Sequence, residues 1–155
     1  MVVSATVCAG APDMDGLPTI FLAEDSPADV YLFGEALKAH GVECNLMVFH
    51  DGETALASVR ASSCGTPHIF VLDLNLPKID GREILKYIRR TPGLAETPVV
   101  ILTSSSSVAD RSETTDMGAS CYICKPLNIS DFLEIGGVIK ALLRLTRITS
   151  HSSAI

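Results

Sequence analysis

Four apolar runs of this sequence each end in side chains that can carry chemistry. In chain order these side chains are Glu24 and Asp25, then Asp73, then Thr103, then Lys125. If the runs form parallel strands of one sheet, their carboxyl ends meet at one edge, where open α/β sheets build their sites. The sequence therefore predicts three carboxylates, one hydroxyl and one ammonium at a single edge.

This predicted set of side chains suits the capture of a phosphoryl group. Three carboxylates held close together repel one another and raise at least one pKa, unless a cation lies among them. A few oxygen ligands favour a hydrated hard ion such as Mg²⁺, which usually binds one or two carboxylates together with phosphate oxygens. An aspartate beside Mg²⁺, an ammonium and a hydroxyl is placed as a nucleophile toward phosphorus.

Each of these residues also has a simpler interpretation when it is taken alone. Asp73 could cap a turn, and Glu24 and Asp25 could be solvated acids favoured by the start of a helix. Lys125 could lie in an exposed loop, and Thr103 could be an ordinary hydroxyl at a strand end. Their occurrence together at successive strand ends favours the chemical interpretation.

The elements that must position these residues alternate along the chain. The run that leads into Asp73 is continuously apolar, which is typical of a strand buried on both faces of a parallel sheet. Predicted strands are 19–23, 44–49, 69–73, 99–103 and 121–124. Predicted helices are 26–40, 52–61, 81–90 and 108–117, and a last one runs from a cap at Asn128 or Ser130 to about Thr146. Five strands, each followed by a helix, predict an α/β domain with a parallel sheet and right-handed crossovers.

Composition excludes several classes of protein. The 155 residues are 47% hydrophobic, and a net charge of -6 without a basic run argues against nucleic acid as a partner. No apolar stretch reaches the roughly 18 residues that span a membrane. Residues 1–17 lack the features of a signal peptide, so we expect a disordered leader there and a cytoplasmic location. We expect the domain itself at 18–146 and a flexible tail at 147–155. Cys121 and Cys124 match C-x-x-C, but about 10 Å of predicted strand separates them, which is too far for a disulfide.

The motifs, taken together and in order, resemble the receiver domain of two-component response regulators. They are Glu24-Asp25-Ser26, Asp73 within Leu-Asp-Leu-Asn-Leu-Pro, Thr103 within Ile-Leu-Thr-Ser, and Tyr122-Ile-Cys-Lys125-Pro126. Their spacing matches that family over about residues 18–146. The resemblance implies a flavodoxin-like receiver fold, with a five-stranded parallel sheet in the order 2-1-3-4-5 and helices on both faces.

The resemblance also implies a phosphoacceptor and a metal site. Asp73 would take phosphate from the phosphohistidine of a sensor histidine kinase. Asp25 and Asp73 would bind Mg²⁺ directly, Glu24 would act through water, and Asn75 would give its backbone carbonyl. Glu24 stands where many receivers have Asp, which changes the reach of this ligand rather than its function.

The same resemblance implies a switch. Thr103 and Lys125 would hold the phosphoryl oxygens, and Tyr122 would swing inward when Thr103 moves. That motion would couple the site to the face built from helix 4, strand 5 and helix 5. A cis peptide bond before Pro126 would aim the Lys125 ammonium. The alternative for Tyr122 is a half-buried strand aromatic without a switching role.

Two features bear on partners. The segment Asp-Leu-Asn-Leu-Pro-Lys, followed by Asp80-Gly-Arg-Glu, resembles the corresponding segment of standalone regulators that partner phytochrome-type kinases. The last helix has more apolar residues than one face requires, which is consistent either with burial on the sheet or with a homodimer or kinase surface at helix 4, strand 5 and helix 5. Gly136 and Gly137 indicate a close backbone approach, either within the domain or across an interface, and we favour the interface.

We therefore expect a single-domain response regulator that is not an enzyme toward outside substrates. One alternative is a receiver-like docking protein that works without phosphate, although such a module would not need the acid, Thr and Lys set. Another is a phosphatase-type enzyme with an Asp nucleophile. Such enzymes use a second Asp two residues on, where this sequence has Asn75.

Overall fold

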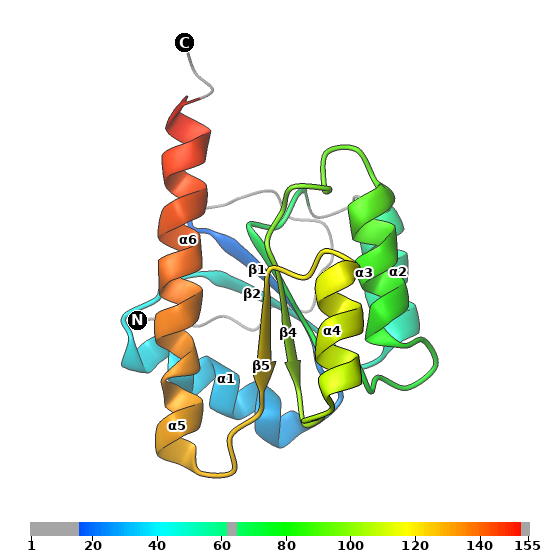
Figure 1. Ribbon diagram of the computed structural model, residues 1–155. Coiled ribbons are helices and arrows are strands. Elements are labelled where there is room, and N and C mark those ends of the chain that lie inside the picture. The colour runs from blue at the N-terminus through cyan, green and yellow to red at the C-terminus, as the bar shows by residue number, and fades with distance from the viewer. Residues whose placement is uncertain (1–15, 62–64, 153–155) are drawn as a thin grey trace.

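The computed structural model describes residues 16–61 and 65–152, and the predicted leader 1–17 lies almost wholly outside them. Strands and helices alternate through the domain (Figure 1). They are β1 Thr19–Ala23, α1 Pro27–Ala39, β2 Asn45–Phe49, α2 Gly52–Ala61, β3 Ile69–Leu72, α3 Gly81–Arg90, β4 Val99–Thr103, α4 Val108–Asp116, β5 Cys121–Cys124, α5 Ile129–Leu133 and α6 Ile135–Ser152.

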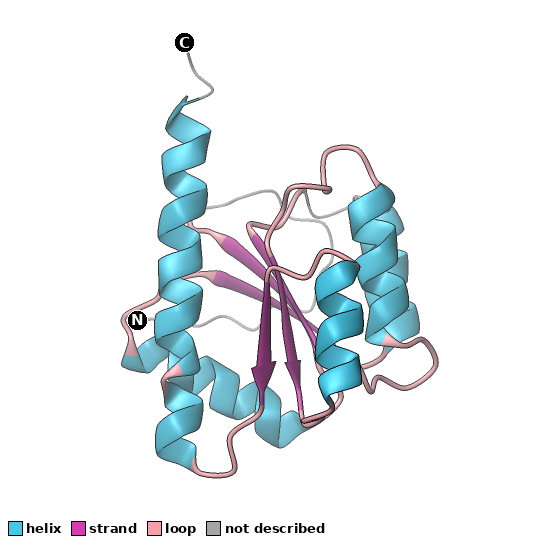
Figure 2. Cartoon of the chain, in the orientation of Figure 1, coloured by secondary structure: helices cyan, strands magenta, loops and turns pink. Residues whose placement is uncertain are grey.

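The sheet has five parallel strands in the order β2-β1-β3-β4-β5, which confirms the predicted fold class. Helices α1, α5 and α6 cover one face, and α2, α3 and α4 cover the other (Figures 1 and 2). β3 lies at the centre, and all four of its residues are buried. The strand that carries Asp73 is therefore held on both sides, which fixes the position of the residue that follows it.

Alternation along each strand builds the core on both faces of the sheet. In β1, Ile20 and Leu22 pack with α1 and α6, whereas Phe21 packs with α2 and α3. The ring of Phe21 stacks on Phe49 with centroids 4.4 Å apart and meets Phe70 at 5.1 Å. Because successive side chains of a strand point to opposite faces, an unbroken apolar run is what two covered faces require.

Polar side chains start four of the helices. Ser26 caps α1 and accepts from the backbone N of Asp29 at 3.3 Å, with Pro27 in the first turn. Asp80 caps α3, Ser107 caps α4, and Asn128 caps α5. These side chains satisfy backbone donors that would otherwise lack partners. Between the two predicted caps of the last helix, the structure selects Asn128.

The carboxyl-terminal helix differs from its prediction in two ways. It is divided at Glu134 into α5 and α6, and α6 continues to Ser152 instead of ending near Thr146. Residues 147–152 contain no Gly or Pro that would stop a helix. The predicted flexible tail 147–155 is therefore helical as far as Ser152.

The two glycines of α6 allow a close approach within the domain. A Cβ atom on Gly136 would lie 2.0 Å from the backbone O of Ala36 in α1, and one on Gly137 would lie 3.1 Å from the His40 ring. We had favoured an interface with another molecule for this pair. That interpretation is wrong for Gly136, because the backbone it meets is that of α1.

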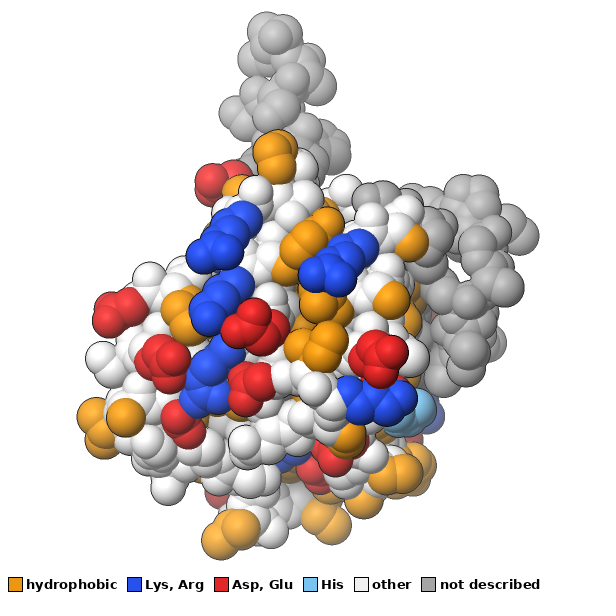
Figure 3. All heavy atoms as spheres, turned by 90° about the vertical axis from the view of Figure 1, so that its right-hand side faces the viewer, with side chains coloured by type: hydrophobic (Ala, Val, Ile, Leu, Met, Phe, Trp, Pro, Cys, Tyr) orange, Lys and Arg blue, Asp and Glu red, His pale blue; other side chains and the backbone are white. Residues whose placement is uncertain are grey.

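Three features considered in the sequence can be compared with the structure. Acidic and basic side chains lie beside one another on the face of the molecule that carries α3 and α4 (Figure 3). Cys121 and Cys124 are free thiols on β5. Within residues 16–61 and 65–152, no helix has both the length and the apolar character needed to cross a membrane.

Candidate functional site

The strand ends bring the predicted acids together. Ala23 is paired with Leu72, so the residues that follow them, Glu24 and Asp73, lie beside each other. The backbone N of Asp73 donates to Ala23 O at 3.0 Å, which continues the β1–β3 ladder by one bond. Glu24, Asp25 and Asp73 each contribute one carboxylate oxygen, and these three oxygens lie within 4.8 Å of one another.

Lys125 reaches into this acidic group from the end of β5. Its Nζ donates to Asp73 Oδ2 at 2.8 Å, to Asp29 Oδ2 at 2.9 Å and to Glu24 Oε1. The Lys125 side chain is only 9% exposed. An ammonium has three donors, and each of them here meets a different carboxylate. This arrangement lets the metal-free domain hold several buried acids in one place.

Asp73 is the buried nucleophile candidate. Burial alone would raise its pKa, but hydrogen bonding with Glu24 and Lys125 and the donor at Asn75 together hold the pKa below the usual value for Asp. The backbone N of Asn75 donates to Asp73 Oδ1 at 3.2 Å. Asp73 is thus an ionised carboxylate near neutral pH, which is the form that can attack phosphorus.

Glu24 differs from Asp73 in its protonation. It is 2% exposed, and burial, followed by the neighbouring Asp73 carboxylate, raises its pKa to about 9 despite the opposing effect of Lys125. Its Oε2 atom is buried and has no hydrogen-bond partner. A cation among the three acids would give that oxygen a partner and would favour the ionised form of Glu24. The donor set therefore fits a divalent metal ion.

Glycine keeps the loop after Asp73 close to the site. A Cβ on Gly81 would lie 2.1 Å from the backbone O of Asp73, so any side chain at this position would displace the acceptor's backbone. The backbone N of Gly81 donates to Leu74 O at 3.0 Å. A Cβ on Gly52 would likewise lie 1.8 Å from Ile79 O, so α2 and α3 both begin in contact with this loop.

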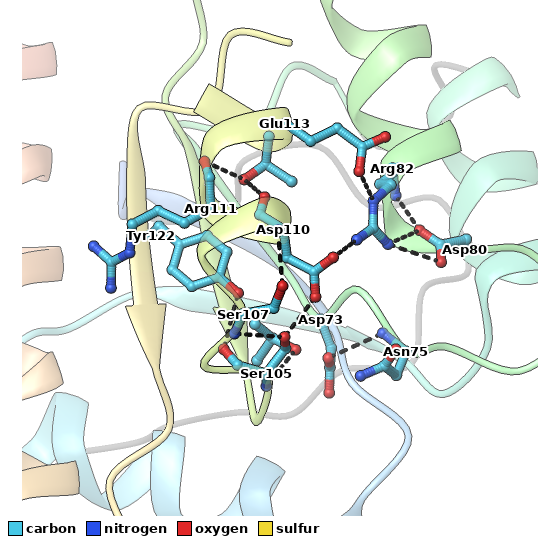
Figure 4. Close-up of polar contacts among 12 residues, drawn as sticks. Asp73, Asn75, Asp80, Arg82, Ser105, Ser107, Asp110, Arg111, Glu113 and Tyr122 are labelled. Atoms are coloured by element: carbon cyan, nitrogen blue, oxygen red, sulfur yellow. Dashed lines mark hydrogen bonds and ion pairs between the residues drawn. The ribbon is translucent and has the colours of Figure 1, made fainter. Parts of the chain in front are cut away.

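Thr103 and Tyr122 are linked through Ser105. Thr103 is fully buried, and its Oγ1 accepts from the backbone N of Ser105 at 3.4 Å. The Tyr122 hydroxyl donates to the backbone O of Ser105 at 2.9 Å (Figure 4). The guanidinium of Arg111 lies 4.8 Å from the centroid of the Tyr122 ring. The two predicted switch residues are therefore joined by one residue of the β4–α4 connection.

A family model described as the response regulator receiver domain matches residues 20–135. This chain belongs to that family. The family acts as the phosphoacceptor in two-component signalling. The predicted recognition and the predicted general function are thus confirmed.

Known receivers resemble this chain over most of its length. Response regulator Rcp1 of Synechocystis sp. is 37% identical over 120 residues, which are 75% of this chain and 82% of Rcp1. The crystal structure of the Mn²⁺-bound form of Rcp1 gives a TM-score of 0.74 at 35% identity and covers 80% of this chain and 92% of that one. The phosphorylated cyanobacterial phytochrome response regulator RcpA gives 0.75 at 37% identity and covers 81% and 92%.

One prediction about this receiver domain is wrong. The Lys125–Pro126 peptide bond was expected to be cis, and it is trans. The trans form of an X–Pro bond is favoured by roughly 0.5–1 kcal/mol. Lys125 already contacts Asp73 from the trans backbone, so reaching the site creates no demand for the cis form.

Two residues of the receiver's site were missed from the sequence. Asp29 was not among the predicted site residues, although its nearness to Glu24 and Asp25 along the chain was a usable signal. Burial alone would raise the pKa of Asp29, but its hydrogen bonds with Lys125 and Glu24 hold that pKa below the usual value. Arg82 gave no such signal, because its partners on α4, Asp110 and Glu113, are distant in sequence.

Arg82 joins α3 to α4 beside the predicted switch residues. Its Nη1 lies 3.2 Å from both carboxylate oxygens of Asp80, its Nε lies 3.0 Å from Glu113 Oε2, and its Nη2 contacts Asp110. Asp110 also accepts a hydrogen bond from the Ser105 hydroxyl (Figure 4). The start of α3 is thereby connected to the residue that contacts both Thr103 and Tyr122.

Proposed function

We propose that this chain is a response regulator receiver that takes a phosphoryl group from a sensor histidine kinase onto Asp73. The observation that carries the proposal is the state of Asp73. It is buried, it is ionised, and one of its oxygens is 2.8 Å from a lysine ammonium. A carboxylate so held is oriented for attack, and its neighbours can offset charge on an incoming phosphoryl group.

The transfer would exchange one bond to phosphorus for another. An oxygen of Asp73 attacks phosphorus, the bond from phosphorus to the imidazole nitrogen breaks, and the electron pair of that bond stays on the nitrogen. Lys125 would hold a phosphoryl oxygen, and we assign the same task to the Thr103 hydroxyl. Tyr122 would report the change through Ser105 to the face formed by α4, β5 and the α5–α6 pair.

We propose Mg²⁺ as the resident metal of this site. Glu24, Asp25 and Asp73 would hold it, together with the backbone carbonyl of Asn75. When bound, the ion would supply positive charge that stabilises the phosphoryl oxygens during transfer. The three clustered acids and the unpartnered Oε2 of Glu24 support this assignment. The Mn²⁺-bound form of the similar Rcp1 supports it further.

The partners of this receiver are proposed from its relatives and from its surface. The similarity to RcpA, a phytochrome response regulator, supports a phytochrome-type histidine kinase as the phosphate donor. A cytoplasmic location stays a proposal. A homodimer through α4, β5 and α6 stays a proposal. A monomer mass in sedimentation that does not change with protein concentration would contradict it. We propose no turnover of outside substrates, because Asn75 stands where phosphatases of this type have a second Asp.

Incubation with Mg²⁺ and acetyl phosphate tests the assignment of Asp73. The wild type should gain about 80 Da, and the adduct should be labile to hydroxylamine as an acyl phosphate is. Asp73→Asn should gain nothing. Asp131→Asn is a matched control, since Asp131 is an exposed acid on α5.

Two results of intact mass spectrometry would contradict the assignment of Asp73 as the phosphoacceptor. An unmodified wild type in the presence of Mg²⁺ would contradict the proposed function. A hydroxylamine-labile adduct that persists in Asp73→Asn would move the phosphoacceptor to another residue.

A further inference from the structure

We propose that Asp29 is a positioning residue that keeps the Lys125 ammonium at the phosphoryl site when the metal and the phosphoryl group occupy its other partners. The inference rests on the proposed function. It concerns a carboxylate outside the three-acid metal cluster. It starts from the 2.9 Å contact between Asp29 Oδ2 and Lys125 Nζ.

The three partners of Lys125 face different demands during the reaction. Glu24 and Asp73 belong to the group of acids that can hold the metal, and Asp73 also receives the phosphoryl group. Ligation to a divalent cation withdraws the negative charge that attracts an ammonium. Asp29 lies outside that group, so its attraction for Lys125 persists when the other two carboxylates are engaged.

The helix that carries Asp29 is firmly placed. Ser26 caps its first turn at the backbone N of Asp29, and Pro27 presets the backbone of the same turn. Further along α1, Gly136 of α6 packs directly against the backbone of Ala36. Asp29 therefore presents its carboxylate from a rigid element, which is what accurate positioning of a partner requires.

Lys125 needs such an anchor more than the other site residues do. Its ammonium is at the end of a flexible four-carbon stem, and it must be immobilised to act on one oxygen of a phosphoryl group. The Asp29 side chain is 27% exposed and the Lys125 side chain 9% exposed, so Asp29 lies at the rim of the site and holds an ammonium that lies deeper in it. Asp29 can thus hold the ammonium without blocking the acceptor oxygen.

A purely structural role for Asp29 makes a different prediction. Acids in the first turn of a helix are stabilised by the helix dipole, whatever they contact across the domain. Loss of that effect would lower stability and leave the phosphorylation rate per folded molecule unchanged. Asp29→Asn keeps the shape of the side chain and removes its charge, so a slower labelling rate per folded molecule, beyond any loss of stability, marks the positioning role.

The matched control lies on the same helix. Glu35 forms an exposed ion pair with Lys38 at 3.1 Å, so Glu35→Gln removes one acid from α1 without touching the site. Asp29→Glu is the conservative variant, which keeps the charge and should recover part of the effect.

The first measurement is the initial rate of acetyl phosphate labelling at saturating Mg²⁺, with Mg²⁺ affinity measured separately by calorimetry. Asp29→Asn should slow labelling by about tenfold, the order expected when a charge that positions a catalytic group is lost. Its Mg²⁺ dissociation constant should stay within about twofold of wild type, because Asp29 is outside the acid cluster. Glu35→Gln should match wild type in both quantities.

The second measurement needs neither metal nor phosphate. Reductive methylation of the metal-free protein, followed by mass spectrometry, reports how tightly the Lys125 amine is held. Residue 125 should react several-fold faster in Asp29→Asn than in wild type or Glu35→Gln, because a hydrogen-bonded ammonium gives up its proton less readily.

These outcomes separate the inference from the proposed function. Equal labelling rates and equal Lys125 reactivity in wild type and Asp29→Asn would overturn the role of Asp29 and leave Asp73 as the acceptor. A loss of Mg²⁺ affinity in step with the labelling rate would make Asp29 a metal ligand and would also overturn it. Absence of any adduct on wild type would refute the proposed function, and the methylation result would still decide whether Asp29 holds Lys125.

Discussion

Glu24 is the residue whose charge depends most on whether a cation is present. In the metal-free domain its pKa is raised to about 9, chiefly by burial. Its unfolded value is 4.5, so the folded state binds one more proton than the unfolded state between these two values. Stability from this group is therefore fully present below pH 4.5 and is lost as the pH rises toward 9.

Glu24→Gln should remove this dependence on pH. With a chelator present, the free energy of unfolding of the wild type should fall from pH 6 to pH 8, by at most about 1.4 kcal/mol per pH unit for one proton. The variant should show a smaller fall, because Gln has no proton to lose. Urea denaturation at the two pH values measures both slopes. If the slopes are equal, the extra proton is not on Glu24.

At the scale of elements, Arg82 fixes how α4 sits beside α3. The side chain is 20% exposed and contacts acids at both helix starts. Through Asp110 it also holds the Ser105 hydroxyl, and Ser105 is the residue that the Tyr122 hydroxyl contacts. We expect the first turn of α4 to be ordered by this bridge as much as by its own Ser107 cap.

Arg82→Gln should loosen that turn and the Tyr122 contact. The expected loss is about 1 kcal/mol in the free energy of unfolding, the upper end for a partly exposed ion pair. Amide hydrogen exchange should speed up in residues 108–114, and a fluorotyrosine signal from residue 122 should broaden. Lys86→Gln, which removes an exposed α3 pair with Glu83 at 3.1 Å, should do neither. Unchanged amide exchange in α4 would refute the role of this bridge in ordering the first turn of α4.

Local patterns were enough to place the elements and the strand-end residues. Glu24, Asp73 and Lys125 were predicted to meet because parallel strands share one carboxyl edge, and the structure brings them into contact. The contacts that the sequence did not reveal are those between separate helices. The bridge from Arg82 to Asp110 and the packing of Gly136 on Ala36 depend on how helices pack in three dimensions. The break at Glu134 was also not predicted, although Gly136 and Gly137 follow it closely.

At the scale of the whole molecule, the acidic edge predicts that stability depends on metal. Lys125 is the cation that links Glu24, Asp29 and Asp73 in the metal-free fold. A divalent ion that binds only the folded state adds to stability by mass action, whatever its local contacts. It also competes with the proton on Glu24, so metal binding should tighten as the pH rises.

Mg²⁺ should therefore stabilise the domain measurably. At about 100 times its dissociation constant, it should add about 2.7 kcal/mol to the free energy of unfolding. A chelator should reverse the gain. Asp25→Asn should lose most of it, because Asp25 is the exposed member of the acid cluster and contributes one of its three oxygens. Thermal unfolding with and without Mg²⁺ measures the effect in both proteins. An equal gain in Asp25→Asn would place the metal elsewhere, and no gain in wild type would mean that the folded domain does not bind the ion.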